Sequence, residues 1–205
     1  MGTIQAVLRA VPSLLDGDEV PPHLTVEEVN RLTGAYQEWF DGKPNIVRAR
    51  HWAVFLLLRY TGCRVSEALS IDDTRDLDFR RSEVVLPTLK RRKQAKRTVP
   101  LPGNVVAEIG RILATWPQLR GNLFRIHRTT VFLTFRKRAE EAGIPPELRH
   151  PHVLRHTRAV ELLRAGVPVS AVQQILEHAN ISTTAVYLRF SEVEIKRIMQ
   201  DRSLL

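Results

Sequence analysis

The chain has 205 residues, 43% of them hydrophobic and 26% charged, so it holds enough apolar material for one globular domain with a real core. Its single cysteine, Cys63, excludes an intramolecular disulfide, and this favours a reducing compartment. One cysteine also supplies too few thiolates for a cysteine-based zinc site. The net charge is +9, and the first thirty residues are acidic, so the basic excess lies in residues 31–205. Such a body attracts polyanions, although charge kept for solubility alone would give the same total.

Neither a membrane span nor a secretion signal is predicted. The longest strongly apolar run, residues 52–58, is far shorter than the roughly 20 residues needed to cross a bilayer. The N-terminus lacks a basic start, a compact apolar centre and a small-residue cleavage site. We therefore expect a cytoplasmic protein.

The first half of the chain predicts an arm followed by helices. Residues 1–23 end in an acidic, proline-rich stretch typical of a loosely held arm. Thr25 and Glu28 form the capping-box pattern that opens a helix reaching about Trp39. The apolar stretch 46–60 predicts a buried central helix that Gly62 ends, and a short helix follows from Val65 to about Ile71.

Three short strands and a second set of helices follow. Residues 76–79, 83–86 and 97–101 are separated by polar turns and predict a small antiparallel sheet. Helical periodicity returns from Pro102, with helices expected at 105–113, at 129–143, and after Pro151, Pro168, Ser182 and Ser191. The predicted fold class is mainly α with a small three-stranded antiparallel β-sheet (α+β).

The turn between the second and third strands is strongly basic. Residues 90–97 hold six cationic side chains and no acid: Lys90, Arg91, Arg92, Lys93, Lys96 and Arg97. A basic ribbon tip without aromatic residues contacts phosphates and groove shape more than base edges, which favours duplex DNA over single strands. The alternative is a solvated loop whose charges discourage pairing between strand edges.

Two further segments predict an anion site. In HPHVLRH, His152 and Arg155 lie three residues apart and share one helix face. In TGCRVSEAL, Arg64 enters a helix whose N-terminus favours an anion, and Glu67 either orients Arg64 or forms an ordinary surface bridge. His156 lies four residues after His152, so an alternative is that the two histidines bind zinc. The sequence has no HExxH pattern and no cysteine pair to complete such a site.

Tyr187 follows His178 by nine residues, in ILEHANISTTAVYLRF. Taken alone, Tyr187 would more often be a core or surface tyrosine, and His178 a packed histidine at a helix end. A turn after His178 and a new helix capped by Ser182 would bring both side chains to one pocket. A phenol among arginines, lysines and histidines can attack a phosphodiester, since the positive field stabilises the charge that develops.

In order and spacing, these segments resemble the catalytic domain of the tyrosine recombinases, the phage integrase and Xer family. TGCRVSEAL is similar to the first arginine box, LKRRKQAKRTVPL to the basic hairpin, HVLRH to the second box and ILEHANISTTAVY to the final histidine and tyrosine box. The resemblance implies a catalytic set of Arg64, Lys90, His152, Arg155, His178 and Tyr187, with Glu67 in support. Arg64 and Arg155 would hold the scissile phosphate, Lys90 would protonate the leaving oxygen, and His152 or the phosphate itself would take the tyrosine proton.

The chain departs from the family pattern in several places. The hairpin is about two residues longer than usual, so Lys93 or Lys96 remain alternatives to Lys90 as the acid. Glu177 and Glu161 replace a glycine and a histidine common in the family. We expect residues 1–23 to be an arm, 24–190 the catalytic domain, and 191–205 a helix docking on a neighbouring protomer. The usual N-terminal clamp domain is expected to be missing.

The resemblance implies a site-specific DNA recombinase that cleaves and rejoins duplex DNA through a 3′-phosphotyrosyl intermediate. It implies no metal or nucleotide cofactor, a homo-oligomer that is tetrameric on paired sites, accessory DNA-binding proteins, and a nucleoid location. Two alternatives remain open. One is a topoisomerase-like enzyme that nicks and reseals one duplex, and the other is a non-catalytic DNA-binding regulator with the same fold.

Overall fold

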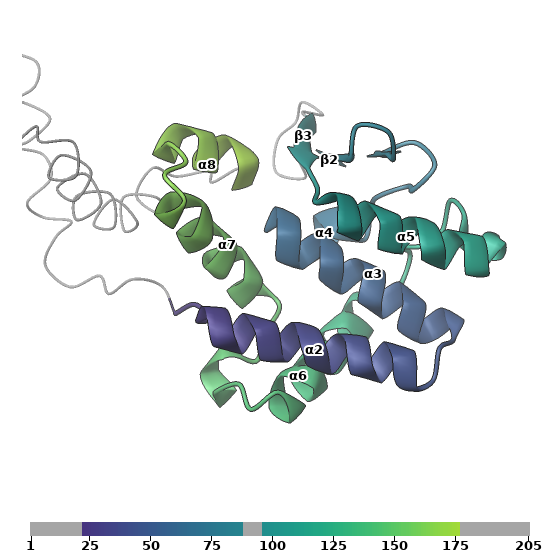
Figure 1. The fold of residues 1–205 in the computed structure, drawn as a ribbon, viewed down its shortest axis with the longest axis horizontal. Coiled ribbons are helices and arrows are strands. Elements are labelled where there is room, and N and C mark those ends of the chain that lie inside the picture. The colour runs from purple at the N-terminus through teal and green to yellow at the C-terminus, as the bar shows by residue number, and fades with distance from the viewer. Residues whose placement is uncertain (1–21, 88–95, 177–205) are drawn as a thin grey trace, which may run out of the picture.

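The protein is described by a computed structural model over residues 22–87 and 96–176 (Figure 1). The elements in chain order are α2 (Val26–Gly42), α3 (Ile46–Thr61), α4 (Val65–Ala68), β1 (Leu77–Asp78), β2 (Glu83–Pro87), β3 (Lys96–Pro100), α5 (Gly103–Thr115), α6 (Arg128–Glu141), α7 (His152–Arg164) and α8 (Val169–Leu176), with 3₁₀ turns at Pro117–Leu119 and Pro146–Leu148. The predicted class, mainly α with a three-stranded antiparallel sheet, is confirmed. The arm up to residue 21 and the helices predicted after Ser182 and Ser191 lie outside the described residues.

Helix α3 is the centre of the domain, as the apolar run predicted. It contacts α2, α4, α5, α6 and α7, which surround it in Figure 1. Every residue from His51 to Leu58 is buried. Asn45 caps its start by accepting hydrogen bonds from the amides of Val47 and Arg48, which satisfies two of the amides that a helix N-terminus leaves unpaired. No helix among the described residues is long and apolar enough to span a membrane.

An aromatic stack joins α2 to α3. The Tyr36 and Phe55 rings lie 4.1 Å apart at 17°, and Phe55 stacks on Trp52 at 5.6 Å and 12°. Burial raises the pKa of the Tyr36 phenol, which therefore stays protonated. Aromatic rings bury large apolar areas, so this stack fixes α2 against the helix that leads into the first arginine box.

The sheet pairs the two strands that flank the basic segment. Strand β2 pairs with β1 and with β3, both antiparallel, and the β2–β3 register runs from Glu83 opposite Pro100 to Pro87 opposite Lys96. Residues 88–95 connect the paired ends, so the six-cation segment spans the hairpin turn and the start of β3. On its other side β3 contacts α8.

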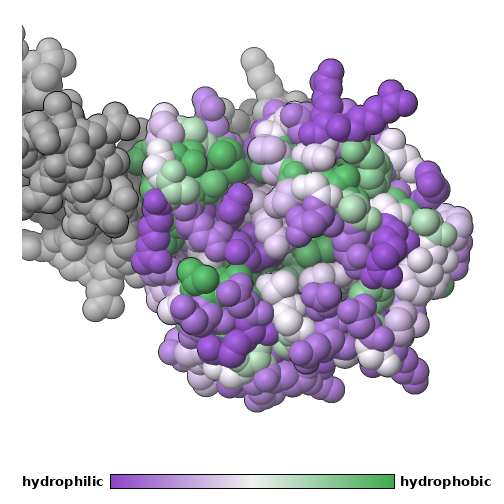
Figure 2. All heavy atoms as spheres, viewed as in Figure 1, coloured by the Kyte–Doolittle hydropathy of each residue, from purple (hydrophilic) through white to green (hydrophobic). Residues whose placement is uncertain are grey.

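Helices α7 and α8 form a small core of their own. Its buried members are Ala159, Val160, Leu163, Val172 and Leu176, separate from the main hydrophobic cluster. Partly buried apolar residues adjoin it, and Figure 2 shows hydrophobic surface over α8 against a mostly polar face. The end of α8 is therefore held by a limited amount of apolar packing.

Gly62 is the point where this small core meets the end of α3. It ends α3 with φ +64°, and a Cβ built there would lie 2.6 Å from Leu176 Cδ2 and 3.2 Å from Arg158 Cβ. Leu176 is fully buried, so its methyl group has little room to move. Both the backbone conformation and the packing require glycine at this position.

We expect Gly62→Ala to lower the free energy of unfolding by about 2–5 kcal/mol, from left-handed strain plus overpacking. Gly143→Ala is the matched control, because Gly143 has φ +66° but open space where a Cβ would lie. Its cost should be only about 1–2 kcal/mol, the strain alone. Urea unfolding of both variants measures the difference, and equal losses would contradict a packing role for Gly62.

Candidate active site

The site is organised around the buried carboxylate of Glu67. Its side chain has 0% exposure, and Oε1 accepts a hydrogen bond from Arg64 Nη1 at 2.7 Å. Glu67 Oε2 accepts from the backbone amide of Arg64 at 3.0 Å, so Glu67 also caps the short helix α4. Of the two roles predicted for Glu67, orienting Arg64 agrees with this burial better than an exposed surface bridge.

Arg97 of β3 reaches the same carboxylate. Its Nη2 donates to Glu67 Oε2 at 2.7 Å and its Nε donates to the carbonyl of Ile175 at 2.7 Å. The side chain is 12% exposed and turned inward, whereas the sequence predicted a surface contact with DNA for Arg97. The reason is strand alternation: Lys96 and Thr98 face outward, whereas Arg97 lies on the face of buried Val99.

Arg155 of α7 is buried behind these groups. Its Nη1 donates to the carbonyl of Gly62 at 3.0 Å and its Nη2 to the carbonyl of Leu176. Its exposure is 3%. Arg155 thus joins the end of α3, helix α7 and the end of α8.

The local field is positive. The pKa of the Arg155 guanidinium falls to about 10, first because it is buried and then because Arg64 and Arg97 carry like charges, with Glu67 partly offsetting them. Burial alone would raise the pKa of Glu67, but hydrogen bonds from Arg64 and Arg97 hold it below its usual value. A bound anion would relieve the repulsion among the guanidinium groups.

His152 and Arg64 line a common cavity of about 320 Å³. The other lining residues are Cys63, Val65, Ser66, Arg128, Phe132 and Pro151. Arg128 was not singled out from the sequence; it is exposed at the start of α6 with its guanidinium 5.3 Å from the Phe132 ring centroid. An arginine at the opening of a predicted helix is too common to have marked it.

The two histidines of α7 lie against each other. The His152 and His156 rings meet edge to face at 4.6 Å between centroids. Burial first, then the charges of Arg155, His150 and Arg64, lowers the pKa of His152. Burial and His152 lower the pKa of His156 to about 4. Within residues 22–87 and 96–176, no group of three or more histidine, cysteine or acidic side chains is arranged to hold a metal ion.

Several predicted site residues lie outside the described residues: Lys90, Arg91, Arg92, Lys93, His178 and Tyr187. Lys96 is described and exposed at the start of β3. The structure thus brings together Arg64, Glu67, His152 and Arg155, with Arg97 in a different position from the one expected. His178 follows Leu176 by two residues, and the Leu176 carbonyl is held by Arg155.

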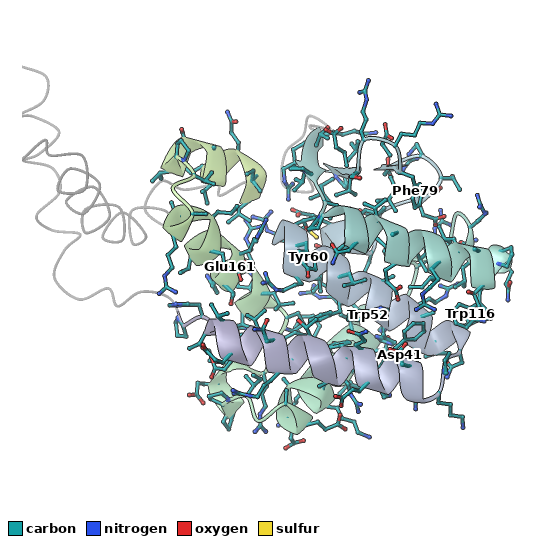
Figure 3. The ribbon with its side chains drawn as sticks, in the orientation of Figure 1. Asp41, Trp52, Tyr60, Phe79, Trp116 and Glu161 are labelled. Atoms are coloured by element: carbon teal, nitrogen blue, oxygen red, sulfur yellow. The ribbon has the colours of Figure 1, made fainter. Side chains whose placement is uncertain are left out.

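Glu161, which departs from the family pattern, joins α7 to α3. It accepts two hydrogen bonds of 2.7 Å from the Arg59 fork, and Arg158 approaches it at 3.3 Å. Figure 3 shows Glu161 on α7 beside the end of α3 that carries Tyr60. Glu161 therefore adds an ion-pair connection between α3, which leads to Arg64, and α7, which carries Arg155.

The domain is mainly helical and places two arginines and a histidine at one cavity, so it belongs with proteins whose site suits a phosphate-like anion. Similarity to known proteins identifies the family. Residues 22–193 match the phage integrase family, and the chain belongs to it. A tyrosine recombinase of Thermosipho africanus is 34% identical over 184 residues, covering 86% of this chain and 60% of that protein.

Solved structures of recombinases have a similar fold. The crystal structure of XerA recombinase superposes with a TM-score of 0.69 at 27% identity, covering 90% of this chain and 64% of that one. XerH recombinase bound to its difH DNA substrate gives 0.68 at 22% identity, covering 90% and 53%. The chain spans between 55 and 64% of the length of the first curated relatives that it matches.

The buried histidines predict acid-sensitive stability. The folded-state pKa of His156 and His51, about 4 in each case, lies below the unfolded value of 6.5. The unfolded chain therefore binds more protons between these pH values, so stability should fall as pH drops from about 6.5 to about 4. Urea unfolding at several pH values in this range should show that the free energy of unfolding depends less steeply on pH in His156→Gln than in the parent chain. An identical slope would contradict the assignment.

Proposed function

We propose that this chain is the catalytic part of a site-specific DNA recombinase that cleaves and rejoins duplex DNA through a 3′-phosphotyrosyl intermediate. The observation that carries the proposal is the common cavity of Arg64 and His152, backed by buried Arg155 and by Glu67. A phosphodiester in this cavity would meet His152 and the Arg64 guanidinium, which Glu67 already holds in place, and it would lie in the positive field to which buried Arg155 contributes. Preorganised donors stabilise charge that develops in a transition state.

The proposed chemistry is one displacement at phosphorus. The Tyr187 oxygen bonds to the phosphorus, the bond from phosphorus to the 5′ oxygen breaks, and that oxygen takes a proton. Arg64 and Arg155 stabilise the non-bridging oxygens, and His178 adds a donor. Lys90 protonates the leaving oxygen, with Lys93 and Lys96 as alternatives. His152, whose lowered pKa keeps it neutral near pH 7, accepts the tyrosine proton unless the phosphate does.

The partners follow from the same proposal. Duplex DNA is the substrate, contacted by the hairpin cations Arg91, Arg92, Lys93 and Lys96. We propose a homo-oligomer, tetrameric on paired sites, in which residues 191–205 dock on a neighbouring protomer, together with accessory DNA-binding proteins at the nucleoid. XerH, described as bound to its DNA substrate in a post-cleavage complex, is a precedent of the same fold.

Incubation with a nicked suicide duplex, followed by denaturing electrophoresis, tests the mechanism. We expect a covalent protein–DNA adduct with the parent chain and none with Tyr187→Phe, because the variant lacks the attacking oxygen. An anisotropy measurement of duplex binding serves as the control and should be unchanged in the variant. An adduct that persists in Tyr187→Phe would refute the assignment of the nucleophile.

Arg128 gives a second prediction, since its exposed guanidinium lines the cavity. Arg128→Gln should weaken duplex binding and reduce the slope of log affinity against log salt by about 0.9, the value for one lost phosphate contact. Arg136→Gln is the matched control, because Arg136 is exposed on the same helix and is not among the cavity-lining residues. Fluorescence anisotropy at several salt concentrations measures both slopes, and equal slopes would exclude the contact.

A further inference from the structure

Arg97 connects three segments that lie far apart in the sequence. It belongs to β3, which follows the basic hairpin; it donates through Nη2 to Glu67 of α4; and it donates through Nε to the carbonyl of Ile175 in the last turn of α8. The sequence separations are 30 and 78 residues. Both distances are 2.7 Å, in the range of charge-assisted hydrogen bonds.

The guanidinium shape is needed for this connection. Nε and Nη2 belong to one rigid plane, so fixing one hydrogen bond also fixes the direction of the other. In the last described turn of α8, Arg97 donates to the Ile175 carbonyl and Arg155 to the Leu176 carbonyl, so two cations hold neighbouring residues. A charged donor makes a stronger hydrogen bond to a carbonyl than a neutral donor does.

We propose that Arg97 is a positioning residue of the site: it orients Arg64 through Glu67 and fixes the end of α8, from which the chain continues to His178 and Tyr187. The inference rests on the proposed function for its catalytic part. Its structural part, the anchoring of α8, stands on the hydrogen bonds alone. Arg97 itself is paired inward with 12% exposure, and we assign it no contact with the reacting phosphate.

Hydrogen exchange measured by mass spectrometry tests the anchoring without any DNA. Arg97→Met should raise exchange of the backbone amides of α8 and α4 by roughly tenfold, the loss expected for one charge-assisted hydrogen bond. Arg138→Met is the control: Arg138 is comparably buried, 8% exposed, and pairs with Glu141 at 2.7 Å on α6. Its effect should fall on α6 and not on α8.

The pH profile of covalent adduct formation on the suicide duplex tests the catalytic part. Glu67 faces Arg64, Arg97, Arg155 and the Cys63 thiol, and loss of the Arg97 charge would raise the Glu67 pKa. Arg97→Met should therefore lose activity most at acidic pH and regain part of it as pH rises, so that the ratio of its rate to the parent rate falls towards low pH. His152 titrates in both proteins and cancels from the comparison. General destabilisation would lower the rate at every pH.

Arg97→Lys separates the two contacts. A lysine keeps a positive charge beside Glu67 but replaces two diverging nitrogens with one. We expect the pH profile to stay close to that of the parent chain while α8 exchange still rises.

The exchange and rate measurements together distinguish the positioning role of Arg97 from the proposed function. Exchange in α8 that rises no more in Arg97→Met than in Arg138→Met would overturn the positioning role. A parallel drop in rate at all pH values would remove the action through Glu67. A parent chain that forms no adduct, with α8 exchange still raised in Arg97→Met, would refute the proposed function and reduce Arg97 to a structural anchor.

Discussion

The rest of the site depends on one buried carboxylate held between two guanidinium groups. Glu67 has no exposed surface, so its negative charge is tolerable only while Arg64 and Arg97 donate to it. In return, the carboxylate fixes the direction of both arginines. The charge that enables a phosphate to bind is therefore oriented before any phosphate arrives. Removing one arginine leaves the buried carboxylate with a single guanidinium partner, which costs more than losing the attraction of an exposed ion pair.

The arginines of this site have two roles, lining the cavity and donating hydrogen bonds to backbone carbonyls. Arg64 lines the cavity, whereas Arg155 and Arg97 satisfy backbone carbonyls at the ends of α3 and α8. Helix ends leave carbonyls unpaired, and a cation is the favoured partner there. The geometry of the site, the end of α3 and the last described turn of α8 thus depend on the same side chains. A substitution made to test catalysis will also change local stability, so each needs a structural readout beside the kinetic one.

Much of the fold could be predicted from local signals. Thr25 with Glu28, Asn45 and Gly62 mark helix ends by short-range hydrogen bonds or backbone conformation, and the structure has helix ends at these places. The run of cations predicted one exposed surface that included Arg97, while the alternation with buried Val99 indicates an inward face for this residue. The partners of Arg155, and Arg59 as the partner of Glu161, lie on elements distant in sequence, and nothing local identifies them. Family resemblance named Arg155 as a site residue, but not its bonds to carbonyls.

The small core beneath α8 has a consequence for how the domain responds to heat. Five buried residues on α7 and α8, Leu176 among them, form a cluster separate from the main one, and hydrogen bonds from two arginines add to it in the last described turn of α8. A unit with so little apolar area opens at a lower free energy than the α2–α3 core. As temperature rises, the helix end leading to the proposed nucleophile would come loose while the arginine boxes remained folded. The thermal limit of activity would then lie below the melting temperature of the domain.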